Sequence, residues 1–286
     1  MGEIRATGLV LHPQRDCGPA IERIRRWATP RGIELFALPG EQGSGPEVPA
    51  LSQSELAERT DLLVSIGGDG TMLRTLRLAY QRQTPVLGVN LGKLGFLAEV
   101  DVPDLDDALE AIAEQRFHVE ARVAVEALVG AEPGRIAFND VAMVRTPGNG
   151  QAAVALTIDG QPFVRYVADA VVVSTPTGST AYSFSAGGPL VSPRAEGLVV
   201  VPVAPHSAFN RALVLACSES LALELLPSSG PLGLEVDGEL TRRLLPGDRV
   251  DLATRLGAGS VIRLGNTTFY QRAQRKLRLS DPGELG

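Results

Sequence analysis

The sequence predicts an α/β domain with a parallel sheet, a mostly β domain after it, and a final helix that returns to the first domain. Three patterns indicate this fold class. Over the first 115 or so residues, apolar runs of strand length alternate with segments of helical spacing. From residue 117 to about 265, apolar residues recur with period two, and the tail at 269–279 has helical spacing again. Strand–helix alternation indicates a parallel sheet covered by helices, and period-two alternation indicates half-buried strands.

The elements of the first half follow from short local patterns. We expect strands at 9–11, 33–38, 62–66 and 85–89, and helices at 21–28, 52–59, 71–82 and 104–115. The stretch "EQGSGPEVP" at 41–49 has the composition of a loop.

The second half has the pattern of strands joined by tight turns. Alternating segments lie at 117–129, 135–145 and 153–167. Asp159-Gly160 and Asp237-Gly238 are hairpin signals, because both residues of such a turn need positive φ. One short helix is expected after Gly178. The predicted domains are therefore 1–116, completed by 267–286, and 117–266.

Composition narrows the class of protein. The chain has 286 residues, 44% of them hydrophobic and 21% charged, with a net charge of -6, as in a soluble globular protein with a core. No basic region suggests nucleic acid, and no apolar run is long enough for a membrane span. Cys17 and Cys217 lie far apart, without disulfide or metal spacing, and the N-terminus lacks a signal-peptide pattern. We expect a cytoplasmic protein.

The glycine-rich stretch 67–71, "GGDGT", joins a predicted strand to a predicted helix. Glycines let the backbone approach a ligand, and amides at a helix start attract anions, so Gly67, Gly68 and Thr71 are candidate phosphate-binding residues. The stretch is neither a P-loop nor a dinucleotide fingerprint. Asp69 could coordinate Mg²⁺ or take a proton from an attacking hydroxyl. The structural alternative is that Asp69 caps the following helix.

Three further stretches are candidates for ligand binding. Residues 174–185, "STPTGSTAYSFS", contain eight hydroxyls after an apolar strand, which suits sugar or phosphate recognition or an ordinary Ser/Thr-rich turn. Asn139-Asp140 interrupts an apolar strand pattern, and would either hold a ribose or adenine group or mark a bulge. Phe96, in "NLGKLGFL" at 90–97, would line an adenine pocket or belong to the core. No histidine or cysteine spacing indicates zinc, and no G-x-S-x-G elbow is present.

Taken in order, "GGDGTMLR", "NLGKLGFL", "ND", "DAVVVSTPTGSTAYSFSAGGP" and "EVDGE" resemble the NAD kinase family. The glycine–aspartate–glycine–threonine loop is shared with diacylglycerol kinases and phosphofructokinases, whereas "TPTGSTAY" is much more specific. The resemblance implies that ATP phosphorylates the 2′-hydroxyl of the adenosine ribose of NAD, giving NADP, with Asp69 as the base. It also implies that 1–116 is a nucleotide-binding domain and 117–266 an NAD-binding domain.

The resemblance extends to individual residues. Asn139 and Asp140 match binders of the adenosine ribose and adenine, and Asp169 matches an acid that family members present to the nicotinamide carboxamide, in some cases from a neighbouring subunit. The segment Thr180 to Ser185 matches the adenine and nicotinamide pocket. With Phe96, the candidate NAD-binding residues are Asp69, Gly70, Arg74, Phe96, Asn139, Asp140, Asp169, Thr180, Ala181, Tyr182, Ser185 and Ala204.

The resemblance also implies cofactors and partners. We expect a divalent metal, Mg²⁺, held chiefly by nucleotide phosphates, with Asp69 and Asp237 as the only candidate protein ligands. We expect a homodimer or homotetramer whose active sites are shared. Ala170, Val167 and Glu239 depart from the family pattern, which leaves open the preference between NAD and NADH and between ATP and polyphosphate. The roles of Glu239 and His206 are unassigned.

Two other functions remain as alternatives. A kinase of another small alcohol would share the fold but would not need "TPTGSTAY". A noncatalytic nucleotide sensor would tolerate the loss of Asp69, which this chain retains.

Overall fold

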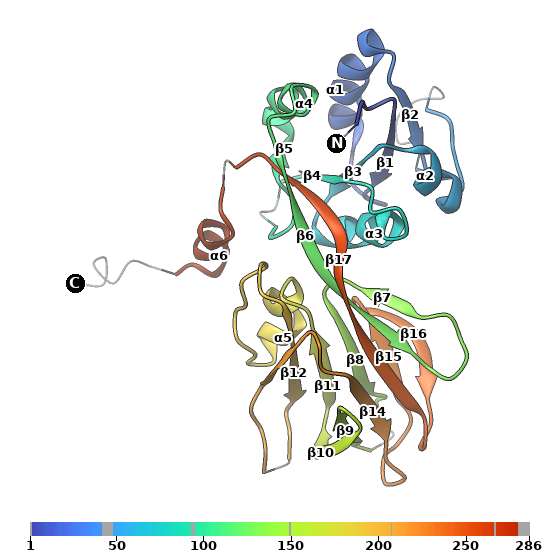
Figure 1. The fold of residues 1–286 in the computed structure, drawn as a ribbon, viewed down its shortest axis with the longest axis vertical. Coiled ribbons are helices and arrows are strands. Elements are labelled where there is room, and N and C mark those ends of the chain that lie inside the picture. Colours follow the sequence, from blue (N-terminus) through green and yellow to red (C-terminus); the bar gives the residue numbers. More distant parts are fainter. Residues whose placement is uncertain are drawn as a thin grey trace, which may run out of the picture. The chain divides into compact units, whose positions relative to one another are not determined.

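The computed structural model describes residues 2–41, 48–92, 95–148, 150–206, 208–265 and 267–279. The chain forms two compact units (Figure 1). Unit 1 comprises Met1–Ala121 and Gly259–Gly286, and unit 2 comprises Arg122–Ala258. The domain boundaries expected from the sequence, 116/117 and 266/267, lie five and eight residues from these. Most of the loop expected at 41–49 lies outside the described residues.

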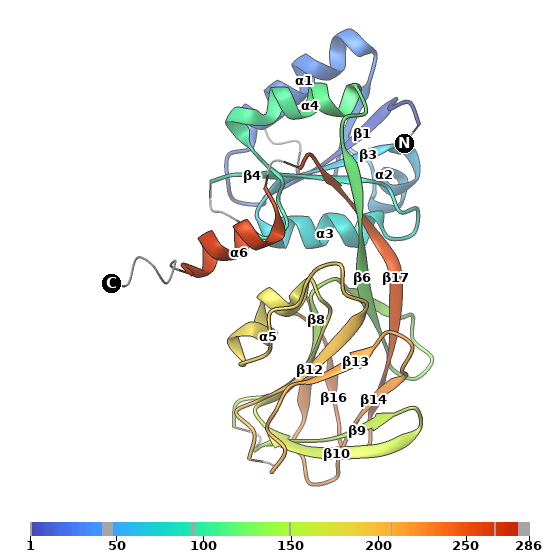
Figure 2. The same cartoon turned by 60° about the vertical axis from the view of Figure 1, so that its left-hand side comes forward.

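Unit 1 is built around a parallel sheet. Its strands have the order β2-β1-β3-β4, and β5 pairs in parallel with β4. Helices α1 and α4 cover one face of this sheet and α3 covers the other (Figure 2). The elements are β1 Ala6–Leu11, α1 Gly18–Ala28, η1 Thr29–Arg31, β2 Glu34–Ala37, α2 Gln53–Arg59, β3 Leu62–Gly67, α3 Asp69–Ala79, β4 Val86–Asn90, β5 Val100–Asp101, η2 Val102–Asp104, α4 Leu105–Ala113 and α6 Phe269–Leu277. The predicted α/β fold is confirmed.

Local sequence explains where these helices lie. Ser52 and Glu55 form a reciprocal capping box at the start of α2, which satisfies two backbone N–H groups. The α1 residues Ile21, Ile24 and Trp27 recur at helical spacing and are buried in the unit 1 core. The helix predicted at 71–82 begins earlier, at Asp69. Residues of the first turn need no intrahelical N–H partner, so Asp and Gly are tolerated there.

Unit 2 is a pair of antiparallel β layers. One sheet has the order β13-β12-β11-β8-β15-β16, and the strands β10-β9-β14-β17 form a second run. β6 begins in unit 1 and ends in unit 2, while β17 runs the other way. The elements are β6 His118–Leu128, β7 Arg135–Ala137, β8 Asp140–Arg145, β9 Ala152–Ile158, β10 Gln161–Ala168, β11 Ala170–Ser174, η3 Gly178–Thr180, α5 Tyr182–Ser185, β12 Gly197–Val203, β13 Leu213–Ala216, β14 Leu221–Leu225, β15 Leu232–Val236, β16 Glu239–Leu244 and β17 Arg249–Arg263.

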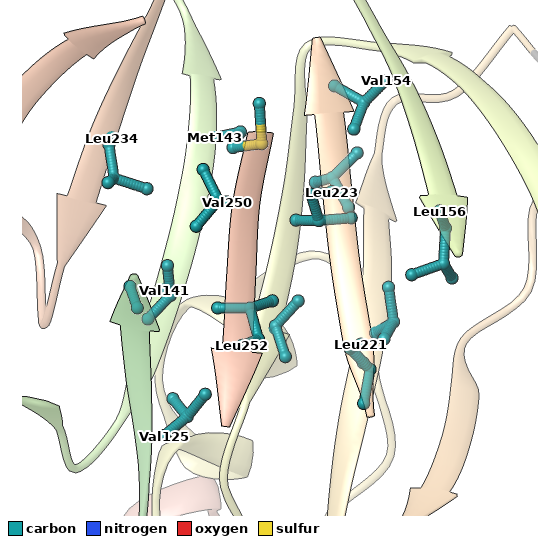
Figure 3. Close-up of a cluster of buried hydrophobic side chains, with 14 of the residues drawn as sticks. Val125, Val141, Met143, Val154, Leu156, Leu221, Leu223, Leu234, Val250 and Leu252 are labelled. Atoms are coloured by element: carbon teal, nitrogen blue, oxygen red, sulfur yellow. The ribbon is translucent and has the colours of Figure 1, made fainter. Parts of the chain in front are cut away.

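The core of unit 2 contains alternate residues of both layers. Val141 and Met143 come from β8, and Leu221, Leu223 and Val250 come from strands of the other layer, so their side chains meet in one apolar cluster (Figure 3). Because every second side chain of a strand points to the same face, the buried residues form one apolar face on each layer, and these two faces pack against each other.

The two predicted hairpin turns are confirmed. Asp159-Gly160 joins β9 to β10 and Asp237-Gly238 joins β15 to β16, and all four residues have positive φ. Among the described helices, none combines the length and the apolar character that a membrane crossing requires.

The C-terminal helix α6 belongs to unit 1, as predicted. Thr268 and Gln271 form a capping box at its start. Arg272 is buried and donates from its guanidinium to the carbonyl oxygens of Ala98, at 3.0 Å, and Phe96, at 3.4 Å. The helix therefore contacts the segment that follows β4.

Candidate active site

The turn between β3 and α3 brings the glycine-rich stretch to the carboxyl end of the parallel sheet. Every residue of β3 is buried, and the helix begins two residues after the strand ends. A Cβ on Gly67 would lie 2.2 Å from the Thr71 hydroxyl oxygen, so this tight approach favours glycine. Gly68 is the N-cap residue of α3 and no side chain caps the helix. The first N–H groups of α3 thus remain available for an anion.

Asp69 is the first residue of α3, and its carboxylate points to the segment after β4. Its Oδ2 accepts a hydrogen bond from the Phe96 N–H and its Oδ1 accepts one from the Leu97 N–H, both at 3.0 Å. The Lys276 ammonium donates to Oδ2 at 3.2 Å. A Cβ on Gly95 would lie 2.3 Å from Oδ1, so glycine there allows the close contact. The alternative that Asp69 caps α3 is wrong, because its oxygens are used elsewhere.

Arg74 links α3 to the carboxyl end of β1. Its guanidinium donates to Glu41 Oε1 at 2.5 Å and to the Leu11 carbonyl oxygen at 2.6 Å. Glu41 Oε2 in turn accepts from the Leu11 N–H at 2.9 Å. If Arg74 binds a phosphate, its guanidinium therefore has to contact both the phosphate and Glu41.

Phe96 is buried in unit 1. Its ring packs against the ring of Phe269, with 6.2 Å between the centroids, and the Lys276 ammonium lies 4.4 Å from its centroid. The Phe96 ring is therefore a core side chain, which was the alternative to an adenine pocket. The Phe96 backbone N–H, in contrast, belongs to the Asp69 site.

A cavity of about 700 Å³ opens at the carboxyl end of β4. Asn90, at the end of β4, donates to Asp101 Oδ1 at 2.7 Å across one wall. Ligands of open α/β sheets bind at this end of the strands. The cavity is lined by Arg15, Asp16, Pro19, Ala20, Asn90, Leu91, Gly92, Asp101, Val102 and Pro103.

In unit 2, Asn139 and Asp140 lie where β7 ends and β8 begins. Asp237, in the β15–β16 turn, accepts three backbone hydrogen bonds at this corner. Its Oδ1 accepts from the Asn139 N–H at 2.7 Å and from the Asp140 N–H at 3.3 Å, and its Oδ2 accepts from the Phe138 N–H at 3.2 Å. The pair therefore separates two strands that belong to different sheets, and the regular register of β8 with β11 and β15 shows no bulge there. Asp237, a candidate metal ligand from sequence, uses both carboxylate oxygens on backbone N–H groups.

Asp140 lies in an acidic and buried environment. Its residue is 4% exposed, and burial, followed by the charges of Asp237 and Glu235, raises its pKa to about 7. Burial also raises the pKa of the Tyr182 phenol, with smaller effects from Glu235, Asp140 and Asp169. Loss of hydration and nearby like charge both disfavour the ionised carboxyl group. Asp140 therefore changes charge near neutral pH.

The hydroxyl-rich turn after β11 packs against the Asn139 corner. Thr175 Oγ1 donates to the Phe138 carbonyl oxygen at 2.5 Å, and Ser174 Oγ donates to the Asn139 carbonyl oxygen at 3.3 Å. A Cβ on Gly178 would lie only 2.1 Å from that same oxygen. These contacts bring the start of η3, the turn that precedes α5, next to Asn139.

Several hydroxyls of this turn bond to nearby backbone. Ser179 Oγ donates to the Pro176 carbonyl oxygen, Thr180 Oγ1 to that of Thr177, and Ser185 Oγ to that of Ala181. An ordinary Ser/Thr-rich turn, which was the alternative to a binding site, therefore accounts for some of the eight hydroxyls. Ser183 differs, because its buried Oγ has no hydrogen-bond partner among the described residues.

Asp169 lies at the opposite end of β11 from the Asn139 corner. Ser174, the last residue of β11, pairs with Asp140, while Asp169 precedes the first residue of the strand. At about 3.4 Å per residue these ends are about 14 Å or more apart. Asp169 is half exposed, and its Oδ1 lies 2.6 Å from Arg145 Nε. Its backbone N–H donates to the carbonyl oxygen of Val203, the residue before Ala204. Ala204 has a positive φ of 44°.

The structure thus gathers the candidates into two groups, one in each unit. The sequence did not point to Lys276, which contacts Asp69 from a helix 207 residues further along the chain. The available signal was weak: Arg272 and Lys276 are spaced as i and i+4 in the helical tail, and so share a face.

Comparisons with known proteins agree with this arrangement. The model of the ATP-NAD kinase N-terminal domain matches residues 47–117, and that of the ATP-NAD kinase C-terminal domain matches residues 138–264. NAD kinase 1 of Streptomyces avermitilis is 37% identical, over 97% of this chain and 88% of its own. NAD kinase of Heliobacterium modesticaldum is 38% identical, over 95% of this chain and 98% of its own.

Two solved structures are similar. Yeast NADH kinase complexed with NADH has a TM-score of 0.86 at 25% identity, over 98% of this chain and 89% of that one. An NAD kinase from Archaeoglobus fulgidus in complex with ATP has a TM-score of 0.75 at 24% identity, over 96% and 100%, and supports the fold alone. The glycine turn with its fixed carboxylate, on a doubly wound sheet, is that of a phosphotransferase acting on an alcohol. Within that class the chain belongs to the NAD kinase family, and it is an ATP-dependent NAD kinase.

Proposed function

We propose that Asp69 is the base for phosphorylation of the 2′-hydroxyl of the NAD adenosine ribose. The hydroxyl proton moves to the Asp69 carboxylate, a bond forms between the hydroxyl oxygen and the terminal phosphorus of ATP, and the bond from that phosphorus to the leaving ADP oxygen breaks. The observation that supports this is a carboxylate held by two backbone N–H groups and one ammonium, beside an uncapped helix start. Phosphoryl transfer depends mainly on such positioning and charge stabilisation.

We assign phosphate recognition to the β3–α3 turn. The N–H groups of the first α3 turn, around Gly68, Gly70 and Thr71, suit an anion because no side chain caps them. The cavity at the end of β4 lies at the same edge of the sheet and has a volume suited to a nucleotide. Arg74 is a second cation near this edge.

For NAD, we assign the adenosine end to Asn139, Asp140 and the turn that contains Thr180, Ala181, Tyr182 and Ser185. An ionised Asp140 accepts hydrogen bonds from hydroxyl groups, and the Asn139 amide both donates and accepts. The packing of the turn on the Asn139 corner supports this assignment. Asp169 and Ala204 form a separate end of the NAD site.

We propose that Mg²⁺ arrives with the nucleotide phosphates. Among the described residues, no group of three or more His, Cys, Asp or Glu side chains could hold a metal ion. Mg²⁺ commonly binds through substrate phosphates, one or two carboxylates and several waters, and it would offset phosphate charge. Titrating Mg²⁺ into the protein without nucleotide tests this: tight stoichiometric binding contradicts the proposal.

We also propose a homodimer or homotetramer with shared sites, in the cytoplasm. Asp169 is half exposed and lies at the far end of β11 from Asp140, which suits service to a neighbouring chain. The two cysteines are free, as is usual in a reducing compartment. Mixing Asp69→Asn and Asp169→Ala chains tests the shared site, because exchange should restore some activity. If exchange is verified by mass and no activity returns, the site is not shared.

The base assignment is tested with Asp69→Asn. We expect kcat to fall by about 10²–10⁴-fold while the NAD dissociation constant hardly changes. A matched control is Asp107→Asn, an exposed carboxylate of α4. A coupled NADP-specific assay, run with NAD or NADH and with ATP or polyphosphate, also resolves the substrate preferences. Asp69→Asn with more than about a third of the wild-type kcat would falsify the assignment, and a wild-type protein that forms no NADP would favour a sensor.

A further inference from the structure

The segment after β4 that binds Asp69 is itself held by the last part of unit 1. Arg263, at the end of β17, donates to the Leu97 carbonyl oxygen at 3.0 Å and to Glu99 Oε2 at 2.8 Å. Arg272, on α6, donates to the Ala98 carbonyl oxygen at 3.0 Å and to the same Glu99 oxygen at 2.5 Å. The Glu99 side chain is almost fully buried. This charged cluster places the N–H groups that meet the Asp69 carboxylate.

Lys276 lies one helical turn after Arg272 and faces the same segment. Its ammonium is 3.2 Å from Asp69 Oδ2 and 4.4 Å from the centroid of the Phe96 ring. Helix α6 thus reaches the first turn of α3 (Figure 2). The ion pair is partly open to solvent, with side-chain exposures of 35% for Lys276 and 28% for Asp69.

We propose that Lys276 is a positioning residue for phosphoryl transfer, which keeps the Asp69 carboxylate oriented toward the substrate hydroxyl. This inference rests on the proposed role of Asp69 as base. The Phe96 and Leu97 N–H groups each hold one carboxylate oxygen, and the Lys276 ammonium adds a third donor on Oδ2, so the three together fix the orientation of the carboxylate. The Phe96 ring restrains the lysine stem, so the ammonium stays beside Oδ2.

A purely structural role for Lys276 predicts something different. Arg272 already anchors α6 with four hydrogen bonds from a buried guanidinium. A partly exposed ion pair adds little to stability. Loss of the Lys276 charge should therefore leave unfolding nearly unchanged and appear in kcat.

The test compares Lys276→Met with Arg275→Met, Lys276→Arg and wild type. Arg275 is the next residue of α6, is exposed, and has no ion pair within the described part of the chain, so it is a matched control. For Lys276→Met we expect kcat/KM at pH 7 to fall about tenfold. We expect the KM for NAD to change by less than about twofold, because the lysine acts on the base and not on NAD binding. Lys276→Arg should regain most of the lost kcat/KM, and Arg275→Met should match wild type.

Stability measurements separate the two roles. We expect the thermal midpoint of Lys276→Met to match that of Arg275→Met. If Lys276→Met and the second variant Lys276→Gln instead unfold early, and their loss of rate follows the loss of folded protein, the lysine is an anchor and the proposal is overturned.

Two further variants distinguish failure of this inference from failure of the proposed function. If Asp69→Asn keeps normal turnover, Asp69 is not the base and the proposed function fails. If Asp69→Asn is nearly inactive but Lys276→Met keeps the wild-type kcat, only the role of Lys276 is refuted. The double variant should lose no more than Asp69→Asn alone, since Lys276 acts through Asp69. A further tenfold loss would mean that the ammonium acts on the phosphoryl group itself, contrary to the proposal.

Discussion

The Asp140→Asn substitution should stabilise unit 2, and more so at pH 8 than at pH 5. Asp140 is buried beside Asp237 and Glu235, and its pKa rises from an ordinary 3.8 to about 7 in the folded protein. Below pH 4 both states hold the proton. As the pH rises, the unfolded chain releases the proton first, so the stability that wild type has below pH 4 is lost progressively up to about pH 7. Asparagine resembles the protonated acid and does not titrate.

The size of the expected gain in stability follows from the shift of the Asp140 pKa. At about 1.4 kcal/mol per pH unit, a shift from 3.8 to about 7 corresponds to about 4 kcal/mol. Water penetration and relaxation reduce the cost of burying a charge, so we expect Asp140→Asn to gain about 1–3 kcal/mol over wild type at pH 8. The difference should shrink to near zero by about pH 4.

Urea denaturation between pH 4 and pH 8 measures this difference. Far-UV circular dichroism follows the β-rich unit 2, while fluorescence of the single tryptophan, Trp27, follows unit 1 and should be the same in both proteins. Asp251→Asn is a matched control, because Asp251 is an exposed carboxylate of unit 2. A gain from Asp140→Asn that is equal at all pH values, or a loss that grows with pH, would refute the assignment of a raised pKa to Asp140.

Three further predictions concern packing. Glu99→Gln leaves the buried Arg272 without an acidic partner among the described residues, and leaves Arg263 with Glu120 alone, so it should destabilise unit 1 by about 3–5 kcal/mol in urea denaturation followed by Trp27 fluorescence; a loss below about 1 kcal/mol contradicts this. Gly178→Ala places a Cβ 2.1 Å from the Asn139 carbonyl oxygen, so NAD binding measured by calorimetry should weaken at least about tenfold. Leu223→Ala, in the unit 2 core, should destabilise by about 2–5 kcal/mol, whereas the exposed Leu240→Ala should change stability by less than about 0.5 kcal/mol.

The sequence predicted the fold class because each unit has a consistent local pattern. Unit 1 alternates buried runs with helical spacing, and unit 2 repeats apolar residues with period two between Asp-Gly turns, whose backbone chemistry is specific. The Asp69 turn was predictable for the same reason, since strand, glycines and helix are adjacent in the chain. Its helix starts at Asp69 because first-turn residues are exempt from the usual helix preferences.

The environment of the carboxylates was beyond sequence reasoning. Helical spacing in the tail indicates which residues share a face, but it does not say that Arg272 and Lys276 meet Glu99 and Asp69. Likewise, the pKa of Asp140 rises to about 7 because its strand end is buried and, to a smaller extent, because the β15–β16 hairpin brings Asp237 and Glu235 next to it. Both results depend on contacts between segments far apart in the chain, which local patterns do not encode.

Unit 1 is made from both ends of the chain, and this bears on when its site forms. Arg272 bonds to Phe96 across 176 residues, and Lys276 to Asp69 across 207. Contacts of such separation form late, because loop closure must precede them. Before residues 259–279 join the sheet, Glu99 lacks both arginines and the Asp69 carboxylate lacks its only ammonium partner among the described residues. The motif at 67–71 therefore determines the turn, whereas the charge around its carboxylate is set by the far end of the chain.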